Sequence, residues 1–518
     1  MKGKISLLVV TLCLLFTVPV SAERILFVPL DDRPVCLAYP TAAFQAAGVE
    51  VVTPPTALLA SHGRNGNPDG LLEWLEQEAP NASSAVVASD SVLYGGLVPS
   101  RTHHEDAGVL KARLARFNAL AQGPLPLRLY VFSTIMRTPR TGSGGTEEPP
   151  YYKTWGTDLF QLSALGDKQE RGLLTDMEKQ EKTVLQQRLP QDVWQDWNQR
   201  RQINEQMNEA LLGALAEGRY AYFVLGRDDT AVYSQSRREF RRLSQLTKNL
   251  SDTRYRSFAG TDEVGWVLLL RAKNDLEQQM PFAKVAYAPG AGLATIASYE
   301  DDTVGNSIKN HLLAAGMLPV QGKADLLLAV HTPFSGKTIE ATEPLKQAPR
   351  TIDASWLAFL REAVDSGTPV TIADVAFSNG GDDALVRTLA KEGLALRMAS
   401  YGGWNTAGNT IGAAIVQGTL AARQPKREQQ RQLAVRYLED WGYQARVRQE
   451  LSAEILWPQG WNGNQLTQEQ RTQLETEGTR RLRLLAGQNH LLPDGFSADQ
   501  VRMTLPWSRM FEAYVTIQ

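Results

Sequence analysis

The segment Tyr222-Phe-Val-Leu-Gly-Arg-Asp-Asp-Thr-Ala-Val-Tyr233 decides both the predicted fold and the predicted site. Apolar residues run into Gly226, and two adjacent carboxylates, Asp228 and Asp229, follow shortly after. Buried parallel strands have continuous apolar sequences, because helices cover both faces of their sheet. In α/β folds, active sites form where such strands end at their carboxyl side. The segment therefore predicts a buried strand that delivers a carboxylate pair to a site.

Further apolar segments end in acidic or polar residues, and helical segments separate them. Strand and helix alternate about ten times, which is typical of a parallel α/β architecture. The other expected strands are residues 24–30, 49–53, 84–90, 127–133, 283–288, 324–330, 369–373 and 395–400. We expect a parallel (β/α)8-type barrel, followed by a smaller α/β unit and a helical C-terminal tail. Two doubly wound α/β domains account for the same alternation and are the alternative.

The domain boundaries follow from shifts in composition. Residues 1–22 are interpreted as a signal peptide, and residues 23–282 as the barrel-like α/β domain. A helical insertion rich in Gln, Glu, Lys and Trp is expected within this domain, at residues 151–218. Residues 283–420 are expected to form the second α/β unit, and residues 421–518 a helical C-terminal region.

The N-terminus has the pattern of a cleavable secretory signal. Lys2 and Lys4 precede an apolar run over residues 5–20, and the small residues Ser21 and Ala22 follow it. An uncleaved membrane anchor is the alternative, but the run is shorter than the roughly 20 residues of a spanning helix. We therefore expect a periplasmic or secreted protein without stable membrane insertion after signal cleavage.

Composition excludes several classes of protein. The chain is 43% hydrophobic and 21% charged with a formal net charge of −2, which is typical of a globular protein and argues against a nucleic-acid partner. Cys36 is the single cysteine after signal removal, so neither an internal disulfide nor a cysteine-rich metal site is expected. The six histidines form no zinc motif, and the motifs of serine hydrolases, nucleotide hydrolases and dinucleotide-binding proteins are missing. No cofactor and no metal are predicted.

The predicted catalytic residues are Asp228 and Asp229. Neighbouring carboxylates repel one another, so that one pKa rises while the other stays low. This divergence suits a general acid beside an anionic stabiliser, as glycoside hydrolysis requires. The pair is similar to the adjacent acids of barrel enzymes that remove N-acetylhexosamines by substrate assistance. That resemblance covers this strand end alone and implies that one acid orients the acetamido group while the other protonates the leaving oxygen.

The predicted substrate-binding residues lie mostly at other strand ends, which a parallel sheet brings to one edge. For any single member, a turn or a helix cap is the structural alternative. The predicted residues are Asp31, Asp32, Arg33, Asp90, Tyr94, Arg137, Asp262, Glu263, Trp404 and Asn405.

Four segments together resemble a bacterial family of unknown function, number 4127. They are residues 25–34 (ILFVPLDDRP), residues 90–96 (DSVLYGG), residues 226–229 (GRDD) and residues 401–406 (YGGWNT). The resemblance spans nearly the whole mature chain, implies one extended unit rather than unrelated modules, and leaves the reaction open.

The leading hypothesis is an exported glycoside hydrolase-like enzyme that acts on a carbohydrate such as an N-acetylhexosaminide. A periplasmic protein that binds a carbohydrate or a cell-wall fragment without catalysis is the alternative. A metal-dependent hydrolase ranks third. In each case, the expected partner is a small-molecule or oligosaccharide ligand.

Overall fold

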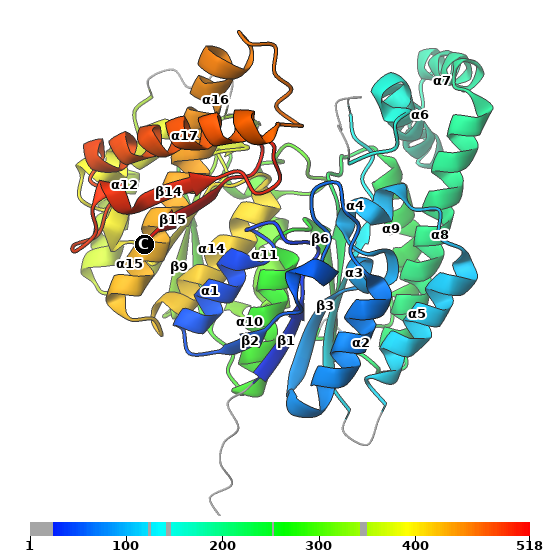
Figure 1. Ribbon diagram of the computed structural model, residues 1–518, viewed down its shortest axis with the longest axis horizontal. Helices are drawn as coiled ribbons and strands as arrows, with labels where there is room; N and C mark the ends of the chain where they lie inside the picture. Colours follow the sequence, from blue (N-terminus) through cyan, green and yellow to red (C-terminus); the bar gives the residue numbers. More distant parts are fainter. Residues whose placement is uncertain (1–23, 123–125, 141–146, 251–252, 342–349) are drawn as a thin grey trace, which may run out of the picture.

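The computed structural model describes residues 24–122, 126–140, 147–250, 253–341 and 350–518. The predicted signal peptide, residues 1–22, lies outside these ranges. The described chain forms two parallel β-sheets with helices between them and around them (Figure 1).

The first sheet has the strand order β2-β1-β3-β4-β5-β6, and every pairing in it is parallel. Its central strands are completely buried, as the apolar runs predicted. Its strands are β1 (Arg24–Val28), β2 (Glu50–Val52), β3 (Ser84–Ala88), β4 (Arg128–Ile135), β5 (Tyr222–Arg227) and β6 (Tyr255–Ala259).

The second sheet has the order β13-β11-β9-β7-β8 and is also parallel. Its strands are β7 (Phe282–Tyr287), β8 (Leu318–Pro319), β9 (Leu326–His331), β11 (Val370–Asp374) and β13 (Ser400–Gly402). The expected strand over residues 395–400 starts later, because Ala395–Arg397 form a 3-10 turn. A short parallel pair, β10 (Ile339–Glu340) and β12 (Phe377–Ser378), follows the second sheet.

The strand order does not confirm the expected (β/α)8 barrel. Both sheets are open, since no pairing among the described residues joins β2 to β6 or β13 to β8. Counted from its own first strand, each sheet contains the order 2-1-3-4-5, which is that of flavodoxin-like doubly wound sheets. The alternative of two doubly wound units therefore agrees with the structure, and a mixed α/β fold with parallel sheets is established.

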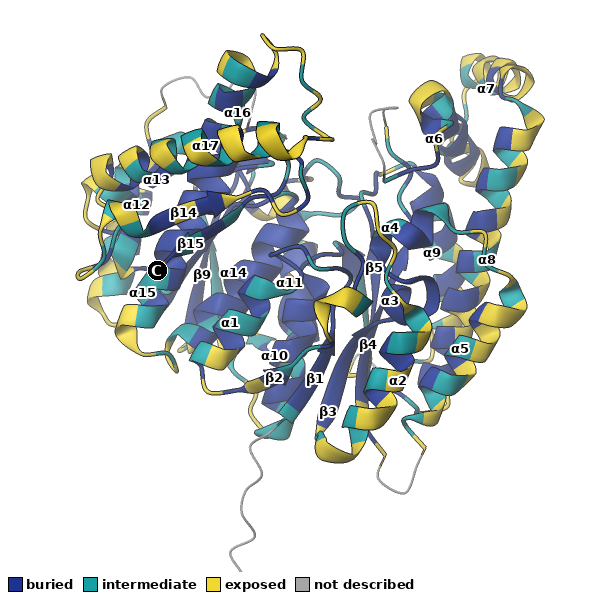
Figure 2. Ribbon diagram, viewed as in Figure 1, coloured by how far each residue is buried: buried dark blue, intermediate teal, exposed yellow. Residues whose placement is uncertain are grey.

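A layer of buried helices separates the two sheets (Figures 1 and 2). Helix α10 packs on the first sheet, α14 packs on the second, and the two helices contact each other. Almost every residue of α14 is buried, and small residues let it approach β11 so closely that a Cβ at Gly418 would overlap the Thr371 hydroxyl. The helices of this layer are α1 (Ala38–Ala46), α10 (Val264–Leu276), α11 (Val304–Ala314) and α14 (Ala407–Ala421).

The outer faces of the sheets carry helices whose solvent sides are exposed (Figure 2). Beside the first sheet lie α2 (Pro68–Glu78), α3 (Ser89–Tyr94), α4 (Leu97–Thr102), α5 (Ala107–Ala119), α8 (Gln191–Ala216) and α9 (Gln235–Leu246). Beside the second sheet lie α12 (Ala354–Asp365), α13 (Asp383–Lys391) and α15 (Lys426–Arg436). Two large apolar cores result. One fills the space between the sheets and continues around the second sheet into its outer helices and the C-terminal region, and the other lies outside the first sheet.

The segment expected to be a helical insertion contains α6 (Tyr152–Glu170), α7 (Asp176–Arg188) and most of α8. These helices project above the first sheet around a small apolar core of their own (Figure 1). None of the helices in the described ranges is both long enough and apolar enough to cross a bilayer.

The C-terminal region is not purely helical, which corrects the expectation of a helical tail. A continuous helix runs from α15 through π-helical turns at Tyr437–Val447 and Ser452–Leu456, with α16 (Arg448–Leu451) between them. Helix α17 (Gln468–Gln488) follows, and then an antiparallel pair, β14 (Val501–Thr504) and β15 (Tyr514–Ile517). The alternating burial of β14 shows a strand with one side on the core, a pattern too short to stand out in the sequence.

Candidate functional site

A cavity of about 500 Å3 lies at the carboxyl ends of both sheets, and we call it the central cavity. The described residues that line it include five arginines and five carboxylates, so their formal charges balance. Its charged and polar lining includes Arg33, Arg101, Arg137, Arg140, Glu147, Asp228, Asp229, Asp262, Tyr299, Glu340, Asn379, Asn405, Asn409, Asn464 and Arg509. Such a balance favours a polar ligand over a polyanion.

Asp228 is fixed by Arg101 in a buried ion pair. The Arg101 guanidinium donates to Asp228 Oδ2 from Nη2 at 2.6 Å and from Nε at 3.1 Å. Arg101 reaches this position because the chain turns at Gly95 and Gly96, both with positive φ, between α3 and α4. A Cβ at Gly96 would lie 2.6 Å from the Cβ of Ala60, so the close approach requires glycine.

Asp229 differs from its neighbour in exposure and in backbone conformation. Its side chain is 28% exposed, its φ is 32°, and its Oδ2 accepts a hydrogen bond from Arg137 Nη1 at 2.9 Å. Burial, and then the charge of Asp228, raise the pKa of Asp229, while Arg137 opposes the rise. Both aspartates are paired with an arginine and line the cavity, but Asp229 is the more exposed of the two and has the raised pKa.

Glu147 joins three arginines of the central cavity. It accepts from Arg137 Nη2 at 2.8 Å, from Arg509 Nη1 at 2.6 Å and from Arg101 Nη1 at 3.3 Å. Burial opposes ionisation of Glu147, but the three guanidinium groups outweigh it, and its pKa lies well below the usual range. Glu147 therefore acts as an anionic centre that orients these arginines.

A second ion-pair group is built on the first strand end. Arg33 binds Asp31 through Nε and Nη2, at 2.9 Å and 2.8 Å, and reaches Asp262 Oδ1 at 2.6 Å. Burial raises the pKa of Asp262 to about 6, even though Arg33 lies beside it. Of these three residues, Arg33 and Asp262 line the central cavity, and Asp31 holds Arg33 from behind.

Backbone strain gathers around the central cavity. Four of its lining residues have left-handed φ angles without being glycine: Asp229 (32°), Tyr299 (67°), Asn379 (58°) and Asn405 (58°). Asparagine and aspartate tolerate this region, but for tyrosine it is a conformational outlier. Such residues persist where the surrounding structure holds them, which is common at functional sites.

Polar side chains from the short β10–β12 pair and from the segments that follow β7 and β13 complete the wall. Glu340 accepts from the Tyr299 hydroxyl at 2.8 Å and from Asn379 Nδ2 at 2.6 Å. Asn405 Nδ2 donates to Asn409 Oδ1 at 2.7 Å. The cavity thus combines acids, guanidinium groups and amides, which suits a ligand rich in hydroxyl or amide groups.

Glu263 and Glu300 lie behind this wall and are buried. Glu263 accepts from Asn409 and contacts His311 Nε2 at 3.1 Å. Glu300 Oε1 accepts from the Gly408 amide at 2.7 Å, and burial raises the pKa of Glu300 to about 8. Glu300 is therefore an uncharged acid at neutral pH.

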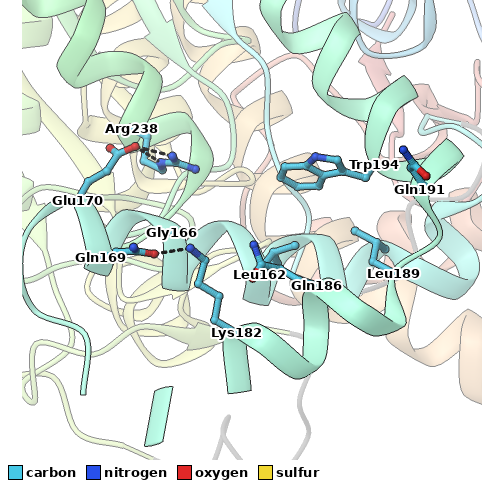
Figure 3. A pocket seen from close by; sticks show the side chains of 10 residues that line it. All are labelled: Leu162, Gly166, Gln169, Glu170, Lys182, Gln186, Leu189, Gln191, Trp194 and Arg238. Atoms are coloured by element: carbon cyan, nitrogen blue, oxygen red, sulfur yellow. Dashed lines mark hydrogen bonds and ion pairs between the residues drawn. The ribbon is translucent and has the colours of Figure 1, made fainter. Parts of the chain in front are cut away.

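A larger cavity of about 810 Å3 lies among α6, α7, α8 and α9 (Figure 3). Trp194 forms one wall of this cavity. The polar side chains that line the cavity bind one another, since Arg238 Nε donates to Glu170 Oε1 at 2.9 Å and Lys182 donates to Gln169. None of the predicted site residues lines it. Its residues supply no strained backbone and no acid with a raised pKa, so the central cavity is the better candidate site.

A model of a protein family described as a protein of unknown function (DUF4127) matches residues 25–516. The chain belongs to the DUF4127 family. No curated protein and no solved structure matches it significantly. The family match covers both sheets, the insertion and the C-terminal hairpin, so the complete central cavity lies inside one DUF4127 unit.

The DUF4127 structure brings half of the predicted residues together. Arg33, Arg137, Asp228, Asp229, Asp262 and Asn405 all line the central cavity. Asp31 and Asp90 lie behind it, and burial raises the pKa of Asp90 to about 7.

The other predicted residues do not line the cavity and make structural contacts instead. Asp32 accepts from the Trp507 indole at 2.7 Å, and Tyr94 packs on His103 with ring centroids 4.6 Å apart. Glu263 lies in the second layer, and the buried Trp404 packs near Phe511.

Sequence reasoning missed much of the charged lining. A short helix supplies Arg101, and loops supply Glu147 and Arg509, so none of the three follows a predicted strand. Glu340 ends one two-residue strand and Asn379 follows another, and both strands are too short for a periodicity signal. The one available signal was Arg509 among aromatic residues, where Trp507 and Phe511 flank it.

Among the described residues, no group of three or more His, Cys, Asp or Glu side chains is arranged to hold a metal ion.

Proposed function

We propose that this protein is an exported glycoside hydrolase-like enzyme that acts on a carbohydrate such as an N-acetylhexosaminide, with Asp228 and Asp229 at the centre of its acid/stabiliser mechanism. The difference between the two aspartates supports this proposal most directly. Asp229 faces the central cavity with a raised pKa, whereas Asp228 is held by Arg101.

In the proposed reaction, Asp229 protonates the glycosidic oxygen as the bond to the leaving group breaks. Its raised pKa keeps the acid protonated to a higher pH than an exposed aspartate. Asp228 stabilises the positive charge that develops on the sugar ring, and Arg101 fixes its position. A water molecule from the solvent then adds to the anomeric carbon and gives a proton to Asp229, which restores the acid and completes the hydrolysis. The amides of Asn405 and Asn409 line the cavity, which supports a role in binding sugar hydroxyl or acetamido groups.

Two substitutions test the mechanism. Asp229→Asn and Asp228→Asn should each abolish hydrolysis of aryl glycosides, including N-acetylhexosaminides, while circular dichroism and thermal unfolding show an intact fold. The exposed Asp494→Asn is the matched control and should keep full activity. Normal turnover in both cavity variants would end the proposal. In the active enzyme, turnover should decline as the pH rises through the pKa of Asp229, because the proton donor is lost.

Export is part of the proposal and rests on the sequence of residues 1–22. Cell fractionation and intact-mass measurement should find a mature chain that begins at Glu23 outside the cytoplasm. A cytoplasmic protein that still begins at Met1 would contradict the proposed export.

One observation favours the alternative, a carbohydrate-binding or wall-fragment-binding protein without catalysis. Asp228, Asp229 and Asp262 are each paired with an arginine, so the polar groups are already organised for hydrogen bonding. Calorimetry with candidate sugars would then show binding while wild-type protein shows no turnover of the same compounds.

A further inference from the structure

The central cavity is the middle one of three adjoining cavities. A cavity of about 540 Å3 beside α6 shares Arg140 and Ser298 with it, and we call this the α6 cavity. A cavity of about 440 Å3 beside α16 shares Asn464 and Phe511 with it, and we call this the tryptophan cavity. The two outer cavities share no lining residue, so the three form a row.

The α6 cavity offers apolar and aromatic surface. Phe160 and Tyr233 line it, with Arg140 5.9 Å from the Phe160 ring and Lys168 5.1 Å from the Tyr233 ring. Ile296, also in the lining, is 44% exposed. Aromatic rings backed by cations and edged by polar groups give a platform for the flat apolar face of a polar ligand.

The tryptophan cavity offers a second platform on the opposite side of the acids. Trp457 is 66% exposed, directly after the π-helical turn Ser452–Leu456, and Trp461 lines the same cavity. A single exposed apolar residue is common on protein surfaces, but neighbouring apolar side chains edged by polar groups are typical of binding sites. Asn462 and Asn464 lie beside the two indoles and supply amide donors and acceptors.

The row therefore alternates in chemistry. Acids and arginines occupy the middle, and aromatic platforms with polar edges lie on either side. Each cavity falls within the roughly 300–1,000 Å3 of a small-molecule site, so one compact ligand would leave two of them empty. A linear chain of repeating units, each with apolar faces and hydroxyl edges, matches all three.

We propose that the three cavities bind one oligosaccharide chain, with at least one sugar residue in each and with Trp457 as a stacking platform. This inference rests on the proposed carbohydrate function and extends it, because it makes the substrate a polymer cut internally rather than a terminal monosaccharide. The bond to be cleaved then lies in the central cavity, beside Asp229.

The test measures binding against chain length. Asp229→Asn protein is titrated by calorimetry with one to six units of β-1,4-linked N-acetylglucosamine, β-1,4-linked glucose and α-1,4-linked glucose. For at least one series, the affinity should rise about tenfold or more between one and three units and then level off, as further contacts of hot-spot size are gained. Trp457→Ala in the same background should lower the affinity for three or more units about tenfold and leave the single unit unchanged.

Phe334→Ala is the matched control. Phe334 is 81% exposed and lines none of the three cavities, so its removal should not change the affinity. Affinity independent of length in all three series, or an undiminished affinity in Trp457→Ala, would overturn the inference.

These outcomes separate the inference from the proposed enzyme. Length-dependent binding with no turnover by the wild-type protein would support the row of cavities and reject the hydrolase. Hydrolysis of single-unit aryl glycosides without any dependence on length would support the hydrolase and reject the row.

Discussion

Replacing Glu300 by Gln should make the protein more stable at alkaline pH and leave its stability at acidic pH nearly unchanged. The Glu300 side chain is buried, and burial raises its pKa from 4.5 to about 8. Glutamine imitates the protonated acid, keeps an oxygen for the Gly408 amide and cannot ionise. The substitution therefore removes the penalty of ionising a buried carboxyl group and little else.

The sign and size of the effect follow from proton linkage. Between pH 4.5 and about 8, the folded state holds the Glu300 proton and the unfolded state does not, so the stability of the wild-type protein falls as the pH rises. Each pKa unit corresponds to about 1.4 kcal/mol, so the gain in Glu300→Gln should approach zero near pH 4 and reach about 5 kcal/mol at pH 9.

Urea unfolding monitored by tryptophan fluorescence at pH 5, 7 and 9 measures the difference in the free energy of unfolding between wild type and Glu300→Gln. The contributions of the other titrating groups are the same in both proteins and cancel in this difference. Glu469→Gln, an exposed substitution on α17, is the control and should show no such trend. Parallel stability curves for wild type and Glu300→Gln across this range would refute the reasoning.

Three further predictions concern stability and are checked by urea unfolding. Arg101→Met should cost roughly 3–5 kcal/mol because it leaves a buried carboxylate unpaired, and a loss below about 1 kcal/mol would contradict the described ion pair. Gly418→Ala should lower the free energy of unfolding by roughly 1–3 kcal/mol, because the added Cβ overpacks against β11. Gly487→Ala, where the Cβ would meet open space, should raise it by up to about 1 kcal/mol, and equal effects of the two substitutions would refute this. His331→Gln should be less stable than the wild type at pH 5.5 but nearly as stable at pH 9. Burial lowers the pKa of His331, but Asp382 outweighs it and raises the pKa, so the ion pair stabilises the fold below about pH 6.5 and is lost at higher pH. A loss of stability that does not depend on pH would contradict this.

Much of the secondary structure could be predicted from the sequence, but the closure of the sheets could not. The apolar runs around Phe27, Val86 and Val224 are uninterrupted because helices cover both faces of their sheet. A barrel and two open sheets need the same alternation of strand and helix. What distinguishes them is which edge strands pair, and the strands β2 and β8 are only a few residues long.

The site was predictable where it depends on strand ends and not where it depends on tertiary packing. Asp228, Asp229 and Asp262 follow parallel strands, whose carboxyl ends share an edge. Glu263 is the neighbour of Asp262 in the sequence, but its side chain contacts His311 behind the cavity wall, because successive side chains point in different directions. Arg509 enters the cavity from the distant C-terminal hairpin, and the aromatic residues that flank it do not indicate in the sequence that it meets the strand ends.

The two ends of the described chain close the site together. The indole of Trp507 donates to Asp32, Val515 and Tyr39 exchange hydrogen bonds between β15 and α1, and Arg509 reaches the central cavity that Arg33 also lines. During synthesis, Asp32 and Tyr39 therefore gain these partners only after 475 and 476 further residues have been added. The walls of the central cavity are therefore complete only after nearly the whole polypeptide has been synthesised.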